Sequence, residues 1–197
     1  MAIPKGLLSL LDDNNGVILT EQANRVGISN ERLRLLVKAG ELEHVTYGVY
    51  SLPEELVDIM YIKQLRRPRI IYSHETALYL HDLTDRDPIR YSVTVPSGYN
   101  VSRLREDGFN VFTIKQDAYD LGTIRMKTMF GNEVVVYDLE RTICDCLRSR
   151  NQMDIAILSD ALKRYVRRKD RNIQKLMRFA ETFQVDRLLR KYLEVLL

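Results

Sequence analysis

The sequence predicts an α+β fold with two domains, and three observations predict it. The first fifty residues alternate short helical and strand patterns, the middle of the chain contains several apolar runs of strand length, and the last sixty residues are helical in periodicity. At 197 residues the chain is somewhat longer than a typical single domain. We therefore expect an N-terminal domain at residues 1–52 and a mixed sheet-and-helix domain with a helical C-terminus at residues 53–197.

The N-terminal domain is expected to begin with a helix, a short strand and a second helix. Four leucines give the first helix an apolar face: Leu7, Leu8, Leu10 and Leu11. The apolar run at 17–19 predicts the strand, and Thr20 is expected to cap the second helix, which ends at Gly27. The turn that follows is so short that the second helix has to cross a third one.

The third helix is expected to run from Ser29, its cap, to Gly40, its left-handed stop. Its predicted apolar face consists of Leu33, Leu36 and Val37. Two alternating apolar runs about Gly48, within residues 42–50, then predict a tight β-hairpin. Two crossing helices followed by such a hairpin indicate a winged helix-turn-helix, with the hairpin as the wing.

The exposed face of the third helix is a candidate DNA-reading surface, because arginine pairs with guanine edges and asparagine with adenine edges. The candidate residues on this recognition helix are Ser29, Asn30, Arg32, Arg34 and Lys38. Arg32 lies near the turn and is equally placed to hold a phosphate. The wing offers hydrogen-bonding side chains at His44, Thr46 and Tyr47. The alternative is a solvated helix face in a module that binds protein.

The second domain is expected to start with a helix at 54–67 that Pro68 ends. Strands are then predicted at 70–72, 91–95, 110–114, 122–129 and 133–137, with one helix at 73–81. Asp138 is expected to cap the first of four C-terminal helices, near 138–150, 154–168, 172–183 and 185–196. This order predicts a mixed sheet followed by a helical bundle.

Positive charge is concentrated at the C-terminal end. Residues 1–52 contain five Lys/Arg and six Asp/Glu, residues 53–140 contain eleven and fourteen, and residues 141–197 contain fourteen and seven. The last segment therefore carries a net +7. Its basic helix face, which is able to bind DNA phosphates, comprises Lys163, Arg164, Arg167, Arg168 and Arg171. The alternative is a solvated face of the helical bundle.

Two histidines and two cysteines are candidate metal ligands that the spacing disfavours. His74 and His81 stand seven residues apart on one predicted helix, about 10 Å along its axis, so they cannot share one ion. We expect them to pack and hydrogen-bond locally. Cys144 and Cys146 lie two apart in an apolar helical pattern and are expected to be reduced core residues.

Three carboxylates, Glu133, Asp138 and Glu140, resemble the metal-binding acids of a nuclease. Such a site needs a lysine just beyond its acids, and Arg141 begins a helix there instead. A role as a helix cap explains why Asp138 lies between the predicted strand and helix, without any catalytic function. We therefore expect no catalytic residues, no metal and no cofactor.

Three sequence blocks point to a family. They are GISNERLRLLVKAGELEHVTYGVY at 27–50, YSHETALYLHDLTDRDP at 72–88 leading into YSVTVP, and VYDLERTICDCL at 136–147. In this order they resemble the AbiEi family of antitoxin regulators from bacterial abortive-infection toxin–antitoxin systems, and the likeness spans nearly the whole chain.

The resemblance implies a non-enzymatic protein with two roles in phage defence. The winged module would bind double-stranded DNA at inverted repeats in its own promoter and repress the operon. The remainder, an AbiEi-type antitoxin domain, would neutralise a neighbouring nucleotidyltransferase-like toxin. Such systems are described as type IV, which means that direct contact with the toxin is not required.

The chain is expected to be cytoplasmic. No stretch reaches the ~20 apolar residues of a membrane span, and the N-terminus turns acidic where a signal peptide needs its cleavage site. Two alternatives remain open. One is a nucleic-acid-processing enzyme with an N-terminal DNA-targeting module, and the other is a regulator that responds to a small ligand.

Overall fold

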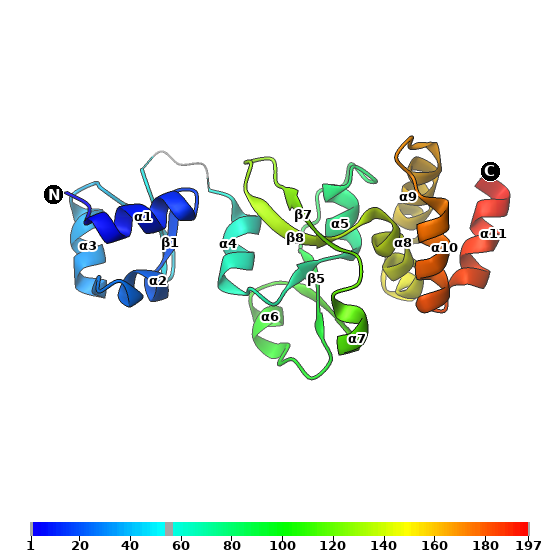
Figure 1. The fold of residues 1–197 in the computed structure, drawn as a ribbon, viewed down its shortest axis with the longest axis horizontal. Helices are drawn as coiled ribbons and strands as arrows, with labels where there is room; N and C mark the ends of the chain where they lie inside the picture. The colour runs from blue at the N-terminus through cyan, green and yellow to red at the C-terminus, as the bar shows by residue number, and fades with distance from the viewer. Residues whose placement is uncertain (1, 54–56, 197) are drawn as a thin grey trace. The chain divides into compact units, whose positions relative to one another are not determined.

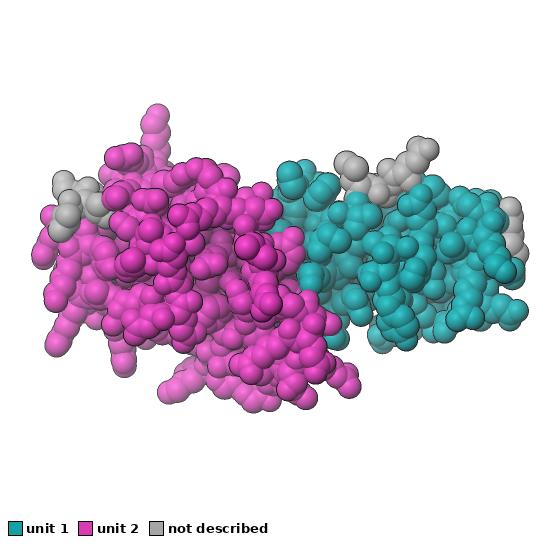
Figure 2. All heavy atoms as spheres, turned by 180° about the vertical axis from the view of Figure 1, so that it is seen from behind, with its two compact units in different colours: residues 1–68, 127–132 teal, residues 69–126, 133–197 magenta. Residues whose placement is uncertain are grey.

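The computed structural model describes residues 2–53 and 57–196. These residues form two compact units, coloured separately in Figure 2. Unit 1 comprises the described residues of 1–68 together with 127–132, and unit 2 comprises 69–126 together with the described residues from 133 onward. The fold is a mixed α+β fold, as predicted.

Unit 1 contains helices around a small antiparallel sheet with the strand order β1-β3-β2 (Figure 1). Its elements are α1 (Lys5–Asp13), β1 (Val17–Leu19), α2 (Thr20–Arg25), α3 (Asn30–Lys38), β2 (Glu43–Thr46), β3 (Val49–Ser51) and α4 (Ile59–Arg66). The predicted order of helix, strand, two helices and hairpin is confirmed. Residues 54–56 of the helix predicted at 54–67 lie outside the described residues, and α4 begins at Ile59.

The predicted ends of α3 and the predicted hairpin turn are confirmed. Ser29 Oγ accepts a hydrogen bond from the N–H of Arg32 at 3.2 Å, which satisfies one of the free N–H groups at the start of the helix. Gly40 has φ 73° just past the helix end, and Gly48 has φ 72° between β2 and β3. Both turns use the left-handed region that glycine adopts without strain.

The predicted cap of α2 is wrong. Thr20 is the first residue of the helix, and the residue before it, Leu19, occupies the cap position. The N–H of Leu19 donates to the side-chain oxygen of Gln22 at 2.8 Å. The Gln22 side chain, which lies in the first turn, thus accepts a hydrogen bond from the residue at the cap position.

The core of unit 1 joins α1, α2, α3 and the sheet. Its buried members are Leu7, Leu11, Ile18, Ala23, Leu33, Leu36, Leu42 and Tyr50. A second cluster joins Ile62 of α4 to Val17 and Val49 of the sheet. Helix α4 therefore packs with the N-terminal residues, whereas the sequence division at 52/53 grouped it with the second domain. The domain boundary at 52/53 stays a prediction.

Asp58 connects α4 to residues 127–132 within unit 1. Its Oδ1 accepts from the N–H of Tyr61 at 3.0 Å and so caps α4. Its Oδ2 accepts from Thr128 Oγ1 and from Asn132 Nδ2, the latter at 2.9 Å. The Asp58 side chain is buried, and its charge is satisfied by these three donors.

Unit 2 is built on a mixed sheet with the strand order β6-β5-β4-β8-β7. Its strands are β4 (Ile71–Tyr72), β5 (Ser92–Pro96), β6 (Asn110–Ile114), β7 (Thr123–Lys127) and β8 (Glu133–Tyr137). Strand β4 pairs antiparallel with β5 and parallel with β8, and β5 pairs parallel with β6. All five predicted strands are present, with small shifts at their ends.

The helices of unit 2 include four that the sequence predicts near the C-terminus. The helices are α5 (His74–Leu80), α6 (Ser102–Glu106), α7 (Gln116–Tyr119), α8 (Leu139–Arg148), α9 (Ile155–Arg167), α10 (Ile173–Thr182) and α11 (Asp186–Leu196), with a 3-10 turn at Arg150–Gln152. The short helices α6 and α7 are not predicted by the sequence. Figure 1 shows α8 to α11 following one another as the helical C-terminus.

Helix α8 is the centre of the unit 2 core, because every residue from Glu140 to Leu147 is buried. Asp138 caps it as predicted, with Oδ1 accepting from the N–H of Arg141 at 2.8 Å. Cys144 and Cys146 are buried and unpaired, as predicted. Because α8 is buried on all sides, its polar side chains need hydrogen-bonding or ionic partners within the protein.

Candidate nucleic-acid interface

A surface hollow of about 590 Å³ lies between α3 and the β2–β3 hairpin of unit 1. It is lined by Thr20, Asn30, Arg34, Val37, Lys38, His44, Tyr47, Gly48 and Tyr50. Five of the eight predicted DNA-contacting residues of the N-terminal domain therefore line one concave surface.

Helix α3 places its polar side chains in one row. Asn30, Arg34 and Lys38 are four residues apart, so they stack along one face of the helix. All three are exposed, while Leu33 and Leu36 are buried on the other side of the helix. The amphipathic pattern thus fixes which side chains are available to a ligand.

The remaining α3 candidates lie outside the lining of the hollow. Ser29 is exposed, but its hydroxyl is engaged in the helix cap. Arg32 is half-buried. A phosphate contact through Arg32 stays a prediction, as does base reading by the row of Asn30, Arg34 and Lys38.

The hairpin contributes two aromatic rings in contact with each other and an exposed tyrosine at its turn. The His44 ring packs edge-on against Tyr50, with centroids 5.3 Å apart. Tyr47 is 86% exposed at the turn before Gly48. Thr46 is exposed but does not line the hollow. Tyr50 is predicted only as a strand residue. The alternating pattern of the hairpin does not predict its ring contact with His44.

The hollow suits an anionic ligand. It contains the guanidinium of Arg34 and the ammonium of Lys38, and no carboxylate is among its described lining residues. Residues 1–52 carry five basic and six acidic side chains, so the positive charge here is local rather than a property of the whole unit. A concave, cationic surface beside an exposed helix is suited to binding a phosphate backbone and base edges.

Comparison with known families supports this assignment of the N-terminal residues. Residues 7–53 match a family model described as "Transcriptional regulator, AbiEi antitoxin". The N-terminal segment matches the AbiEi family. The matched residues contain the whole hollow, and they make up about a quarter of the chain.

A solved structure has a similar fold over most of the chain. The crystal structure of the RV2827C protein from Mycobacterium tuberculosis superposes with a TM-score of 0.59 at 15% sequence identity. The similarity covers 91% of this chain and 72% of that protein. At this identity the likeness concerns the fold alone. No curated protein matches the chain in sequence.

The predicted basic face on and after α9 is largely engaged in contacts within unit 2. Arg164 donates to Asp85 through Nη1, at 2.9 Å, and through Nη2. Arg168 donates to Asp170 through Nε and Nη2, at 2.8 Å for both bonds. Lys163 lies 3.7 Å from Asp160. Asp160 and Asp170 are already included in the net +7 of residues 141–197, whereas Asp85 lies outside that segment. Among these pairs only Arg164 with Asp85 therefore lowers the local net charge below the sequence count.

A test of the basic face uses the double variant Arg164→Ala/Arg167→Ala. Arg167 and Arg164 are both exposed, and Arg171 donates to a backbone carbonyl at 2.9 Å. If both arginines contact phosphates, the slope of log affinity against log salt is expected to flatten by nearly 2. DNA binding measured at several salt concentrations decides this. An unchanged slope would remove the basic face from the DNA interface.

His74 is buried between two hydroxyls. Its Nδ1 lies 2.9 Å from Ser73 Oγ, and its Nε2 lies 3.0 Å from Ser149 Oγ. The ring stacks on Phe112 with centroids 3.5 Å apart. Burial, with smaller contributions from two nearby arginines, lowers the pKa of His74 to about 3. The imidazole is therefore neutral at physiological pH.

His81 is a packed residue as well. It is buried, and its Nε2 donates to the carbonyl of Tyr137 at 2.7 Å. Burial lowers the pKa of His81. The prediction that these histidines pack and hydrogen-bond is confirmed, although His74 reaches a partner 75 residues away. Within residues 2–53 and 57–196, no group of three or more His, Cys, Asp or Glu side chains is arranged to hold a metal.

The three candidate nuclease acids do not form one group. Glu133 is exposed and lies 3.5 Å from Arg125, at the opposite end of β8 from Asp138. Asp138 follows Glu133 by five residue steps of extended chain, which places the two acids roughly 16 Å apart. The acids of the junction are thus a pair rather than a triad.

Arg141 follows the acids in the sequence, as noted above, but a lysine from a distant helix reaches them. Lys175 of α10 lies 2.9 Å from Asp138 and 3.3 Å from Glu140. Glu140 also accepts from the hydroxyl of Tyr165 at 3.0 Å. Lys175 forms ion pairs with both buried carboxylates and so connects α10 to the start of α8. The sequence spacing misses it because Lys175 comes from a distant helix.

Proposed function

We propose that this protein is an AbiEi-type antitoxin and transcriptional regulator that represses its own operon. In this proposal unit 1 acts as a winged helix-turn-helix, with α3 in the major groove and the β2–β3 hairpin as the wing. Its ligand is double-stranded promoter DNA containing inverted repeats. The observation that carries the proposal is the cationic hollow that α3 and the hairpin share, within the residues matched by the AbiEi model.

The remaining part of the proposal concerns the toxin. Unit 2 would supply the antitoxin activity against a nucleotidyltransferase-like toxin encoded beside it, without a required contact, in the bacterial cytoplasm. In support, no described helix has both the length and the apolar character needed to cross a membrane. Co-expression tests this part: the neighbouring gene product should arrest growth alone and be harmless with this protein. Continued arrest would refute the antitoxin role.

The variant Arg34→Ala tests DNA reading. Because Arg34 is exposed at the middle of the α3 row, its loss is expected to weaken binding to the operator by about 1–3 kcal/mol if it contacts a base. Fluorescence anisotropy with operator and scrambled duplexes at one salt concentration measures the effect. Scrambled DNA should be affected much less.

The matched control is Arg25→Ala. Arg25 is an exposed arginine of the same unit that pairs with Glu21 and does not line the hollow. This variant removes one positive charge from unit 1, as Arg34→Ala does, but it removes the charge outside the hollow. The operator preference should therefore be unchanged. Equal losses for the two variants, or no loss for Arg34→Ala, would place the recognition surface elsewhere.

A further inference from the structure

Strand β6 has a free backbone edge. It is the outermost strand of the five-stranded sheet, and it pairs with β5 along Asn110–Ile114. The N–H of Asn110 and the carbonyl of Ile114 hydrogen-bond toward the β5 side, at 3.0 and 2.7 Å. In parallel strands alternate residues direct both backbone groups to the same neighbour. Val111 and Thr113 therefore direct their N–H and C=O groups away from β5.

These outward groups make no bond within the described part of the chain. No hydrogen bond joins the backbone of Val111 or Thr113 to a strand, loop or side chain on the outer side of β6. An edge of this kind is a template for pairing with another extended segment, and proteins usually cover or charge it. Here two N–H donors and two carbonyl acceptors remain available.

A groove follows this edge. Two hollows, of about 820 and about 230 Å³, share the residues Val111, Phe112 and Gln152 and so join along β6. The facing wall comes from the C-terminal ends of α8 and α10, including Arg148 and Thr182. Together the two hollows are lined by every residue of β6, from Asn110 to Ile114.

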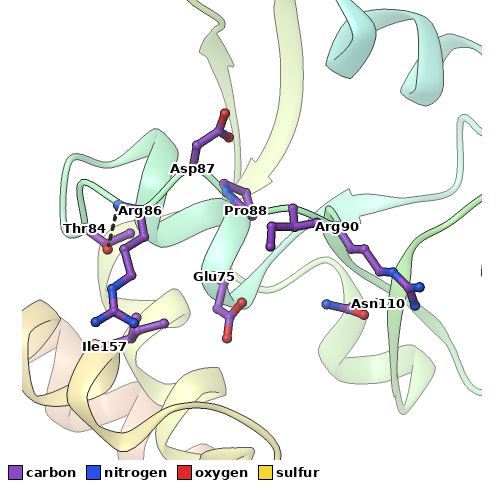
Figure 3. Close-up of a pocket in the computed structure, with 9 residues that line it drawn as sticks. Glu75, Thr84, Arg86, Asp87, Pro88, Arg90, Asn110 and Ile157 are labelled. Atoms are coloured by element: carbon purple, nitrogen blue, oxygen red, sulfur yellow. Dashed lines mark hydrogen bonds between the residues drawn. The ribbon is translucent and has the colours of Figure 1, made fainter.

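The groove extends further at the start of β6. A third hollow, of about 390 Å³, shares Glu75 and Asn110 with the smaller of the first two. Figure 3 shows this hollow, with Glu75 between Ile157 on one side and Asn110 on the other. All three hollows lie within unit 2, and each shares lining residues with the next. Together they are called the trench.

The centre of the trench is positively charged. Arg148 lines it and lies 3.9 Å from Asp145, but Asp145 already accepts a hydrogen bond from buried Arg141 at 2.9 Å. One carboxylate thus faces two guanidinium groups. Lys115 and Asp117, which also line the trench, cancel each other. These five groups leave a net charge of +1, exposed through Arg148.

We propose that this trench binds an extended acidic peptide segment of a partner protein, which adds to β6 as a sixth strand. The peptide backbone would pair with the outward groups of Val111 and Thr113, and a carboxylate of the peptide would face Arg148. A second copy of this chain is a poorer occupant, because it would bring the same positive trench against the first. The inference concerns unit 2 alone and does not depend on DNA binding.

The test uses the full chain and two labelled five-residue peptides, Val-Glu-Val-Glu-Val and Val-Lys-Val-Lys-Val, in fluorescence anisotropy. The acidic peptide is expected to bind at least about tenfold more tightly than the basic one. Thr113→Pro should weaken acidic-peptide binding by about tenfold or more, because it removes one outward N–H and keeps the bonds to β5. The matched control Thr113→Val keeps that N–H and should keep the affinity.

Three outcomes would overturn the proposal. They are equal binding of the two peptides, wild-type affinity in a folded Thr113→Pro variant, and a dimer in light scattering that Thr113→Pro abolishes. The last outcome would identify a second copy as the occupant. If Thr113→Pro fails to fold, amide exchange of the wild-type protein decides. Slower exchange at Val111 and Thr113 with the acidic peptide supports the proposal, and unchanged exchange overturns it.

Discussion

Replacing Arg141 with methionine is expected to lower the free energy of unfolding by about 3–5 kcal/mol, because it leaves a buried charge without its partner. The Arg141 side chain is fully buried, and its Nε donates to Asp145 at 2.9 Å. Its Nη1 donates to the carbonyls of Ala118 and Leu121 at 2.9 and 2.7 Å. Methionine fills a similar length but provides none of these donors.

The surroundings of Arg141 offer no replacement. Its guanidinium lies 4.1 Å from the ring centroids of both Tyr137 and Phe183. Without it, Asp145 would keep only Arg148, at 3.9 Å. Burial already raises the pKa of Asp145 in spite of the two arginines. Arg141 is the first of the interactions that oppose this rise.

Urea denaturation of the wild type and of Arg141→Met measures this loss. The double variant Arg141→Met/Asp145→Leu is the control, because it removes the unpaired charge and should recover a substantial part of the stability. A loss below about 1 kcal/mol for the single variant would show that the ion pair is not a main support of the unit 2 core.

Acidification from pH 6.5 toward pH 4 is expected to destabilise the protein through His74, by up to about 1.4 kcal/mol per pH unit. The folded state keeps the imidazole neutral because its pKa is lowered to about 3. The unfolded chain takes up a proton below about pH 6.5. In this window the unfolded state binds more protons, so stability is present above pH 6.5 and is lost as the pH falls toward 3.

The variant His74→Gln isolates this contribution. Glutamine does not titrate, and its amide is able to reach the Ser73 and Ser149 hydroxyls that the imidazole contacts. Unfolding free energies at several pH values should therefore show a shallower dependence for this variant. His44→Gln, which changes an exposed histidine, is the matched control. A wild-type slope in His74→Gln would contradict the prediction.

Much of the fold was predictable because its elements carry local signals. The caps Ser29 and Asp138 and the turn residue Gly48 stand where the chain changes direction, and each uses a short-range interaction. Helices α6 and α7 were missed because five and four residues are too few to show a helical period. Their positions depend on contacts with the rest of unit 2.

The candidate site was predictable in part for the same reason. An amphipathic helix determines its own exposed row, so Asn30, Arg34 and Lys38 were identified from spacing alone. That the hairpin residues His44 and Tyr47 line the same hollow follows only from the tertiary structure.

Partners far apart in the sequence were not predictable. Arg164 meets Asp85 across 79 residues, and Lys175 reaches the Asp138 and Glu140 pair from another helix. Composition counted these cations as free charge because no local pattern encodes such contacts. The sequence count therefore overstated the free positive charge at Arg164 of α9 and at Lys175 of α10.

The contacts of Asp58 with Thr128 and Asn132 set an order for synthesis on the ribosome. These partners follow Asp58 by 70 and 74 residues. At roughly 5–20 residues per second, they are made several seconds after it. Until then the buried carboxylate has only its helix cap. Unit 1 is consequently completed only after strands β4 to β7 have been translated, and a nascent chain arrested before residue 132 would carry it unfinished.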